Sequence, residues 1–195
     1  QDMEATELIF GTNVLGAHRM ARAVLPGMRK KGGGLIVPIS SQLGRVIVPF
    51  AGLYSATKFA LEAMSEQLAY ELVPHNIEVS IIEPGGYPTE VWVNRNIYTA
   101  ALKRRAEDLH TEGYPQVVAS MGTEDGSGRS ANPLDIPAAI ARIIAMPAGT
   151  RPLRTAVHPG AKPQTRINAV SAETQLNWLG GSGYGPLIKA VHNVD

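Results

Sequence analysis

The stretch "LYSATKFALEAMSEQLAYELVPHNIEVSIIEP" (residues 53–84) contains the pattern of a helix followed by the pattern of a strand. Apolar residues recur at helical spacing over 53–73, which predicts an amphipathic helix. Residues 76–84 are rich in valine and isoleucine, which predicts a strand. The run 35–40, before the helix, is typical of a strand buried on both faces of a parallel sheet. Strand, helix and strand in this order predict a parallel α/β unit.

The same alternation continues on both sides of this unit. Helical spacing precedes it, and a helix, a strand and a last helix follow it; the predicted ranges are 10–28, 132–147, 152–159 and 165–180. Parallel strands joined by helices require helices on both faces of the sheet. We therefore expect a three-layer, Rossmann-like doubly wound parallel sheet, in a single domain over residues 1–195.

A long connection, residues 86–132, follows the strand at 76–84. A connection of this length is rarely unstructured in a compact domain, and a mobile segment beside a site is typical of a lid. We predict a substrate-binding lid with a helix over 102–110 and a glycine- and serine-rich hinge over 122–130. Tyr87 and Trp92 are predicted to line its substrate pocket, although aromatic residues of a lid also pack it onto the domain.

Composition narrows the possible functions. Hydrophobic residues make up 44% and charged residues 18% of the 195 residues, and the net charge is +1. Without a basic excess we expect neither a nucleic-acid partner nor a membrane surface as partner.

The absence of cysteine excludes disulfides, and the five histidines have no ligand spacing, so no metal site is expected. No apolar run is long enough to span a bilayer, which favours a cytoplasmic location.

Two groups of polar residues suggest chemistry. Tyr54 and Lys58 lie four residues apart on one helix face, where the ammonium would lower the pKa of the phenol. Taken alone, such a pair is more often an ordinary solvated pair. Ser40 and Ser41 end the strand at 35–40, and ligands of open parallel sheets bind beyond the carboxyl ends of strands. A serine hydroxyl there can hold a carbonyl oxygen, or it can simply cap a turn.

Together these residues resemble the short-chain dehydrogenase/reductase family, in its single-domain branch, over essentially the whole chain. The resemblance rests on "TNVLG" with Asn13, "LPGM", "GGLIVPISSQLG", "YSATK" and "IEPGGYPTE". Ser41 lies thirteen positions before Tyr54, the spacing of the family, so Ser41 is preferred to Ser40.

The resemblance implies a role for each matching residue. Tyr54 would be the general acid/base, and Lys58 would lower its pKa and bind the nicotinamide ribose. Ser41 would orient and polarise the carbonyl group. Asn13 would hold a water that links Lys58 to solvent. The residues implied at the nicotinamide end are Pro84, Gly85 and Thr89.

The implied function is hydride transfer between NAD or NADP and a small-molecule alcohol or carbonyl substrate. A nucleotide-sugar epimerase or dehydratase, or a non-catalytic dinucleotide-binding descendant, is the alternative. The helices at 10–28 and 53–73 would pair across a two-fold axis, giving a homodimer or homotetramer. The family's glycine-rich phosphate loop does not occur in this sequence. We therefore expect a chain that lacks the N-terminal cofactor-binding section of the family and belongs to a longer enzyme.

Overall fold

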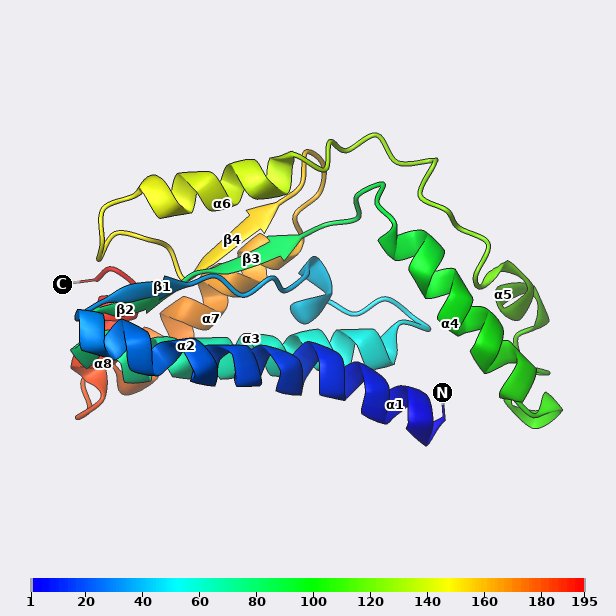
Figure 1. The fold of residues 1–195 in the computed structure, drawn as a ribbon, viewed down its shortest axis with the longest axis horizontal. Helices are drawn as coiled ribbons and strands as arrows, with labels where there is room; N and C mark the ends of the chain where they lie inside the picture. The colour runs from blue at the N-terminus through cyan, green and yellow to red at the C-terminus, as the bar shows by residue number, and fades with distance from the viewer. Residues whose placement is uncertain (1, 195) are drawn as a thin grey trace.

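A computed structural model describes residues 2–194, and its strands form the predicted parallel sheet (Figure 1). Strand β1 (Gly34–Ile36) pairs with β2 (Ile77–Val79), and β3 (Ile81–Pro84) pairs with β4 (Arg154–Val157). Both pairings are parallel, and all the strands point towards the same end of the molecule. The predicted α/β class is confirmed.

Strands β2 and β3 are the two halves of the strand predicted at 76–84. The backbone N–H of Ser80 donates to Ile36, whereas that of Ile81 donates to Leu153. Successive residues of this middle strand therefore bond to opposite neighbours, which joins the β1–β2 and β3–β4 pairs into one sheet. Beyond β1, the carbonyl of Pro38 still accepts from Ile82 at 2.9 Å, so the proline leaves the alignment with the middle strand intact.

Helices cover both faces of the sheet (Figure 1). The helix predicted at 10–28 is one continuous run made of α1 (Met3–Phe10), a π-helical turn (Gly11–Gly16) and α2 (Ala17–Lys31). This run, α3 (Gly52–Leu72), α7 (Gln164–Leu179) and α8 (Gly185–Val191) lie on one side, and α6 (Asp135–Ala145) lies on the other. The sequence did not predict α8. Asp135 is the first residue of α6. Just before the helix, the side-chain oxygen of Asn132 accepts the N–H of Leu134.

The middle strand separates two apolar clusters. Ile81 and Ile82 are both completely buried and point to opposite faces, as successive residues of a strand must. Ile81 packs in the cluster with α3, and Ile82 packs in the cluster with α6. Burial of each such side chain stabilises the fold by about 1.5–3 kcal/mol.

The lid leaves the sheet at the carboxyl ends of the strands (Figure 1). It contains α4 (Val91–Arg105), a 3₁₀ turn (Asp108–His110) and α5 (Pro115–Ser120), so the predicted helix at 102–110 begins earlier and is interrupted. Arg105 forms an ion pair with Asp2 at 2.8 Å. Tyr114 packs edge-to-face on Phe50, with ring centroids 5.2 Å apart. The lid therefore contacts both the first helix and the loop before α3.

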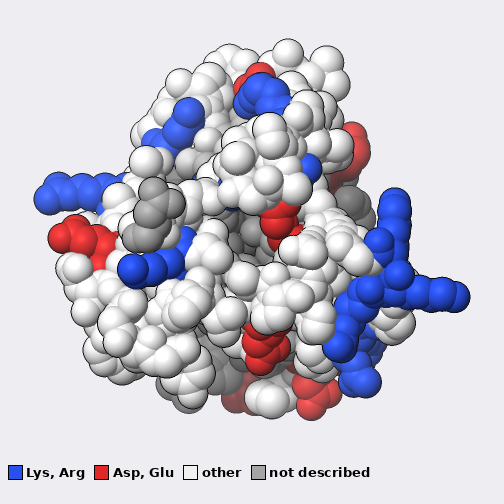
Figure 2. All heavy atoms as spheres, turned by 90° about the vertical axis from the view of Figure 1, so that its left-hand side faces the viewer, with Lys and Arg blue, Asp and Glu red and all other residues white. Residues whose placement is uncertain are grey.

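Charged side chains are distributed over the surface in separate groups. Figure 2 shows lysine and arginine side chains interspersed with acidic and uncharged ones. Three basic residues, Arg29, Lys30 and Lys31, occupy the last turn of α2, where positive charge suits the helix dipole.

Within residues 2–194, no helix is both long and apolar enough to cross a membrane.

Candidate active site

The candidate site lies where β1 and β3 end and α3 begins. Ser41 follows β1 in an extended conformation, and its hydroxyl oxygen accepts the N–H of Leu43 at 3.1 Å. This bond starts a 3₁₀ turn over Gln42–Gly44 and fixes the side chain. The hydroxyl hydrogen of Ser41 is not used by this bond, so it can be donated to another group.

Tyr54 lies in the first turn of α3, next to Ser41. Burial raises the pKa of the Tyr54 hydroxyl, and a hydrogen bond with Ser41 opposes this effect. The phenol therefore keeps its proton at neutral pH. A phenol in this state can donate a proton but cannot accept one.

Lys58 lies one turn further along α3. Its ammonium donates to the carbonyl of Ile39 at 2.9 Å and lies 5.7 Å from the ring centroid of Tyr54. Burial lowers the pKa of Lys58, and the carboxylate of Glu62 opposes this effect. The prediction that Lys58 lowers the pKa of Tyr54 is not supported by this arrangement, because burial dominates at Tyr54 and raises its pKa.

Asn13 is joined to the same helix through Thr57. The amide nitrogen of Asn13 donates to the Thr57 hydroxyl at 3.1 Å, and that hydroxyl donates to the carbonyl of Tyr54 at 2.7 Å. Asn13 lies in the π-helical turn, a distortion that is frequent at functional sites. Thr57 was not predicted as a site residue, because a threonine that bonds back along its own helix gives no distinct sequence signal.

The turn after β3 carries the other predicted residues. The N–H of Gly85 donates to Val157 at 2.9 Å, and a Cβ atom at Gly85 would lie 2.6 Å from the ring of His158. Only glycine fits there without a shift of the histidine. Pro84 and Gly85 therefore lie at the sheet edge, as predicted, whereas the side chain of Thr89 is exposed just before α4.

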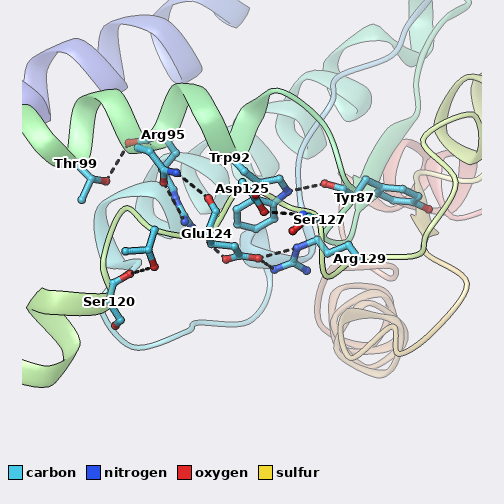
Figure 3. Close-up of polar contacts among 11 residues, drawn as sticks. Tyr87, Trp92, Arg95, Thr99, Ser120, Glu124, Asp125, Ser127 and Arg129 are labelled. Atoms are coloured by element: carbon cyan, nitrogen blue, oxygen red, sulfur yellow. Dashed lines mark hydrogen bonds and ion pairs between the residues drawn. The ribbon is translucent and has the colours of Figure 1, made fainter.

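Tyr87, which was predicted to line the substrate pocket, lies inside the domain. Its side chain is buried in the cluster with α6, packs edge-to-face on His158 and donates to Asp135 at 3.4 Å. Trp92 also differs from its prediction, because the guanidinium groups of Arg95 and Arg129 cover its ring (Figure 3). Both environments are built by segments far along the chain, which the local sequence does not reveal.

A buried ionic group, here called the core cluster, lies behind the site and consists of Glu62, Glu66, Glu83 and Arg154. Arg154 lies 2.8 Å from Glu62, 2.5 Å from Glu66 and 3.8 Å from Glu83. Three carboxyl groups thus surround one guanidinium. Burial, together with the charge of Glu62, raises the pKa of Glu83 to about 7.

The residues at this edge fit the nicotinamide end of NAD(P). Of the three N–H groups of Lys58, one is used by Ile39, which leaves two donors for a ribose diol. At Gly85 the space that a side chain would take is filled by the ring of His158, so this glycine keeps the turn compact at the end of β3. Tyr54, Lys58, Pro84 and Gly85 are the residues that would hold this part of the cofactor.

Comparison with known proteins gives a consistent result. A family model for short chain dehydrogenases matches residues 1–98. A 3-ketodihydrosphingosine reductase from Bacteroides thetaiotaomicron is 37% identical over 156 residues, which are 80% of this chain and 55% of the relative. Human retinol dehydrogenase 8 is 35% identical over 178 residues, 89% of this chain and 56% of the relative. The chain thus spans about half the length of the curated relatives it matches.

Solved structures agree in fold. A short-chain dehydrogenase from Streptomyces avermitilis has a TM-score of 0.65 and 29% identity, covering 91% of this chain and 62% of that one. A serine dehydrogenase complexed with NADP+ has a TM-score of 0.61 and 25% identity, covering 82% of this chain and 57% of that one. The likeness therefore extends over the sheet and its helices.

Proposed function

Because the chain belongs to the short-chain dehydrogenase family, we propose that it carries the catalytic part of an NAD(P)-dependent oxidoreductase. The enzyme interconverts a carbonyl compound and the corresponding alcohol. The single observation that carries this proposal is the meeting of Ser41 with Tyr54 at the strand ends, one helical turn from Lys58. A hydroxyl that orients a carbonyl oxygen beside one that can protonate it is what such a reduction needs.

Ser41 and Tyr54 have different roles in the proposed reduction. The bound cofactor supplies the hydride, which carries two electrons to the carbonyl carbon. Ser41 donates a hydrogen bond to the substrate oxygen, and Tyr54 transfers its hydroxyl proton to that oxygen, which yields the alcohol. The Tyr54 phenolate then regains a proton from solvent. Burial raises the pKa of the Tyr54 hydroxyl, so the group carries the proton that this step needs.

Lys58 and Asn13 support this proton transfer. One unused N–H of Lys58 binds a ribose hydroxyl and so fixes the cofactor next to Tyr54, and the other is left to donate to a water. The amide nitrogen of Asn13 donates a hydrogen bond to Thr57, and the amide oxygen is left to accept a hydrogen bond from a water. Such a water would connect Lys58 to solvent and return the proton to Tyr54.

The substrate we propose is apolar and elongated. One support comes from the two relatives, which are named as a 3-ketodihydrosphingosine reductase and a retinol dehydrogenase. The other support is the lid, where α4 exposes a set of apolar side chains, namely Val91, Val93, Ile97 and Tyr98. An apolar wall of this kind removes the hydrocarbon part of a substrate from water.

The test uses the intact protein with NADH or NADPH and a series of ketones of increasing chain length. We expect one alcohol formed for each cofactor oxidised, and a preference for the longer ketones. Ser41→Ala should reduce kcat by roughly 10²–10³-fold, as expected for losing a donor to the substrate oxygen. Tyr184→Phe, a change at an exposed residue just before α8, is the control and should be neutral.

The same experiment separates the alternative functions. An epimerase or dehydratase would convert a nucleotide sugar without net oxidation of the cofactor. A non-catalytic descendant would bind the cofactor and turn over neither substrate class. Either result would replace the oxidoreductase proposal.

The assembly we propose is an isologous dimer, or a tetramer of such dimers, formed through α2 and α3. Leu15, Met20 and Val24 on the first helical run are exposed, as is Phe59 of α3. Ala56 and Ala63 flank Phe59 on the exposed surface of α3, and small residues let helices approach closely. Light scattering of the intact protein should give a dimer or tetramer at micromolar concentration, and a strict monomer would contradict this assembly.

A cytoplasmic location completes the proposal and rests on composition and on the absence of a spanning helix in residues 2–194. Cell fractionation checks it. The intact protein should remain in the supernatant after membranes are pelleted, and recovery in the pellet would contradict the prediction.

A further inference from the structure

Trp92 joins the lid to the turn that follows β3. Its indole nitrogen donates to the carbonyl of Tyr87 at 2.6 Å. The guanidinium carbons of Arg95 and Arg129 lie 4.7 Å and 4.0 Å from the centroid of its ring (Figure 3). Cation–π contacts of this kind are attractive. The ring is therefore occupied by protein groups and does not form a wall for substrate.

Glu124 holds the two arginines in place. Its Oε1 accepts from Nε and Nη2 of Arg129 at 2.9 Å and 2.5 Å, and its Oε2 lies 3.7 Å from Nη1 of Arg95. The amide of Asn96 donates to the backbone carbonyl of Glu124 at 2.8 Å. The loop that carries Glu124 and Arg129 is thereby attached to α4 through both side chain and backbone (Figure 3).

A glycine allows this loop to approach the indole. Gly126 has a left-handed φ of +87°, and a Cβ atom there would lie 2.6 Å from Trp92. A larger residue would suffer both backbone strain and a clash. The segment predicted as a flexible hinge is therefore a loop whose close contact with Trp92 depends on glycine.

Arg129 reaches the turn after β3 directly. A Cβ atom at Gly86 would overlap its Nη1, so the guanidinium packs against the backbone of Gly86. Trp92 bonds to Tyr87, the next residue. The lid thus contacts two successive residues of the turn that begins with Gly85, which is the turn placed above at the nicotinamide end.

We propose that Trp92, Glu124 and Arg129 form a clamp, here called the lid clamp, that positions the turn at residues 85–87 for the nicotinamide end of the cofactor. They are positioning residues, and the inference rests on the proposed function for the identity of the ligand. A turn with two glycines has much conformational freedom to lose, and the clamp removes this freedom before the cofactor binds.

The strength of the clamp suits this role. The side chains of Arg129 and Glu124 are 33% and 42% exposed, so their ion pair contributes little to overall stability. An ion pair with so small an interaction energy breaks readily, yet it still favours one position of the turn. The lid clamp therefore acts on the position of the turn, and through it on cofactor affinity, rather than on folding.

Cofactor binding to the intact protein tests the clamp, with NADH and NADPH fluorescence giving the dissociation constant. Arg129→Ala should raise it about tenfold, through loss of the ion pair and the cation–π contact. Arg129→Lys should recover part of this loss, because lysine keeps the charge but not the forked geometry. Arg104→Ala, an exposed change on α4, is the control and should be neutral. The KM for cofactor should rise with the dissociation constant, while kcat changes less.

Glu124→Gln separates a clamp from simple charge attraction. If Arg129 acts only as a positive charge for the cofactor phosphates, removing Glu124 should tighten binding. The clamp predicts the opposite, a dissociation constant raised about two- to fivefold. Unchanged or tighter binding by Glu124→Gln would overturn the proposal.

Hydrogen exchange gives a readout that needs no cofactor. Amide exchange over residues 85–92 should be faster in Glu124→Gln than in the wild type, and equal exchange would overturn the clamp. If the wild type binds neither NADH nor NADPH, the proposed function fails. The exchange measurement still decides whether the clamp exists.

Discussion

The protein contains two arginine–carboxylate groups that differ in burial, the core cluster between α3 and the sheet and the lid clamp on α4. In the core cluster the side chains of Arg154, Glu62 and Glu83 are 6%, 2% and 0% exposed. In the lid clamp Arg129 and Glu124 are 33% and 42% exposed. Similar chemistry therefore serves two purposes. Breaking a buried pair leaves an uncompensated charge, whereas an exposed pair opens at little cost.

The two groups also support opposite sides of the site. The core cluster holds α3, which carries Tyr54 and Lys58, against β3 and β4. The lid clamp holds the turn that continues from β3. We infer that the catalytic helix is fixed by folding, and that the cofactor turn is adjustable. Substitutions in the core cluster and in the lid clamp test this inference.

The largest effect on stability is expected from Arg154→Met. This change leaves buried carboxylates without their cation and should lower the free energy of unfolding by about 3–5 kcal/mol. Urea denaturation of the intact protein measures the change. Arg95→Met in the lid is the control and should cost about 1 kcal/mol or less. Equal losses for the two variants would remove the distinction between the groups.

Glu83→Gln should change how stability depends on pH. The pKa of Glu83 is raised from 4.5 to about 7 in the folded protein, so between these values only the unfolded chain gives up the proton. Stability from this group is therefore lost as pH rises from 4.5 to 7, by roughly 3 kcal/mol. His192, whose pKa is lowered mainly by burial, has the opposite slope but is present in both proteins. The stability difference between wild type and Glu83→Gln isolates the carboxyl group, and a constant difference across this range would contradict the account.

Hydrogen exchange should distinguish parts of the lid from one another and from the core. Residues 106–121 lie between the contacts of α4 and the lid clamp and are mostly exposed, so their amides should exchange at least about tenfold faster than those of β3. Cofactor with substrate should slow exchange over 91–120 if the lid closes. Equal protection with and without both ligands would show a permanently packed insertion.

The smallest effect is expected from Glu124→Gln on overall stability. Its ion pairs are exposed, so the free energy of unfolding should fall by about 1 kcal/mol or less, and less still at high salt. Denaturation at low and high salt measures this. A loss as large as that of Arg154→Met would show that the lid clamp is part of the folding core.

Local sequence patterns predicted the elements, because their signals lie within a few residues. The stripe over 53–73 matches α3, and the run over 76–84 lies in the middle of the sheet. The four-residue spacing of Tyr54 and Lys58 holds in the helix. The π-helical turn at Gly11–Gly16 escaped prediction, because a single extra residue in a helical turn leaves the apolar spacing almost unchanged.

Side-chain environments in the lid could not be predicted in the same way. Tyr87 is buried because α6 brings Asp135 to it from 48 positions away, and Trp92 is covered because a later loop returns with Arg129. Aromatic composition indicates a pocket wall and a packed contact equally well. The effect of burial on the pKa of Tyr54 also depends on the assembled fold, so the spacing of Tyr54 and Lys58 does not reveal it.

The most direct test of the account is proton donation by Tyr54, measured with NAD(P)H deuterated at the transferring position and a long-chain ketone. The intact wild-type protein should place one deuterium on the carbinol carbon. At saturating cofactor, Tyr54→Phe should form this alcohol on the order of 10²–10⁴-fold more slowly, because the proton donor is gone. A Tyr54→Phe protein that forms the deuterated alcohol at the wild-type rate would contradict the account.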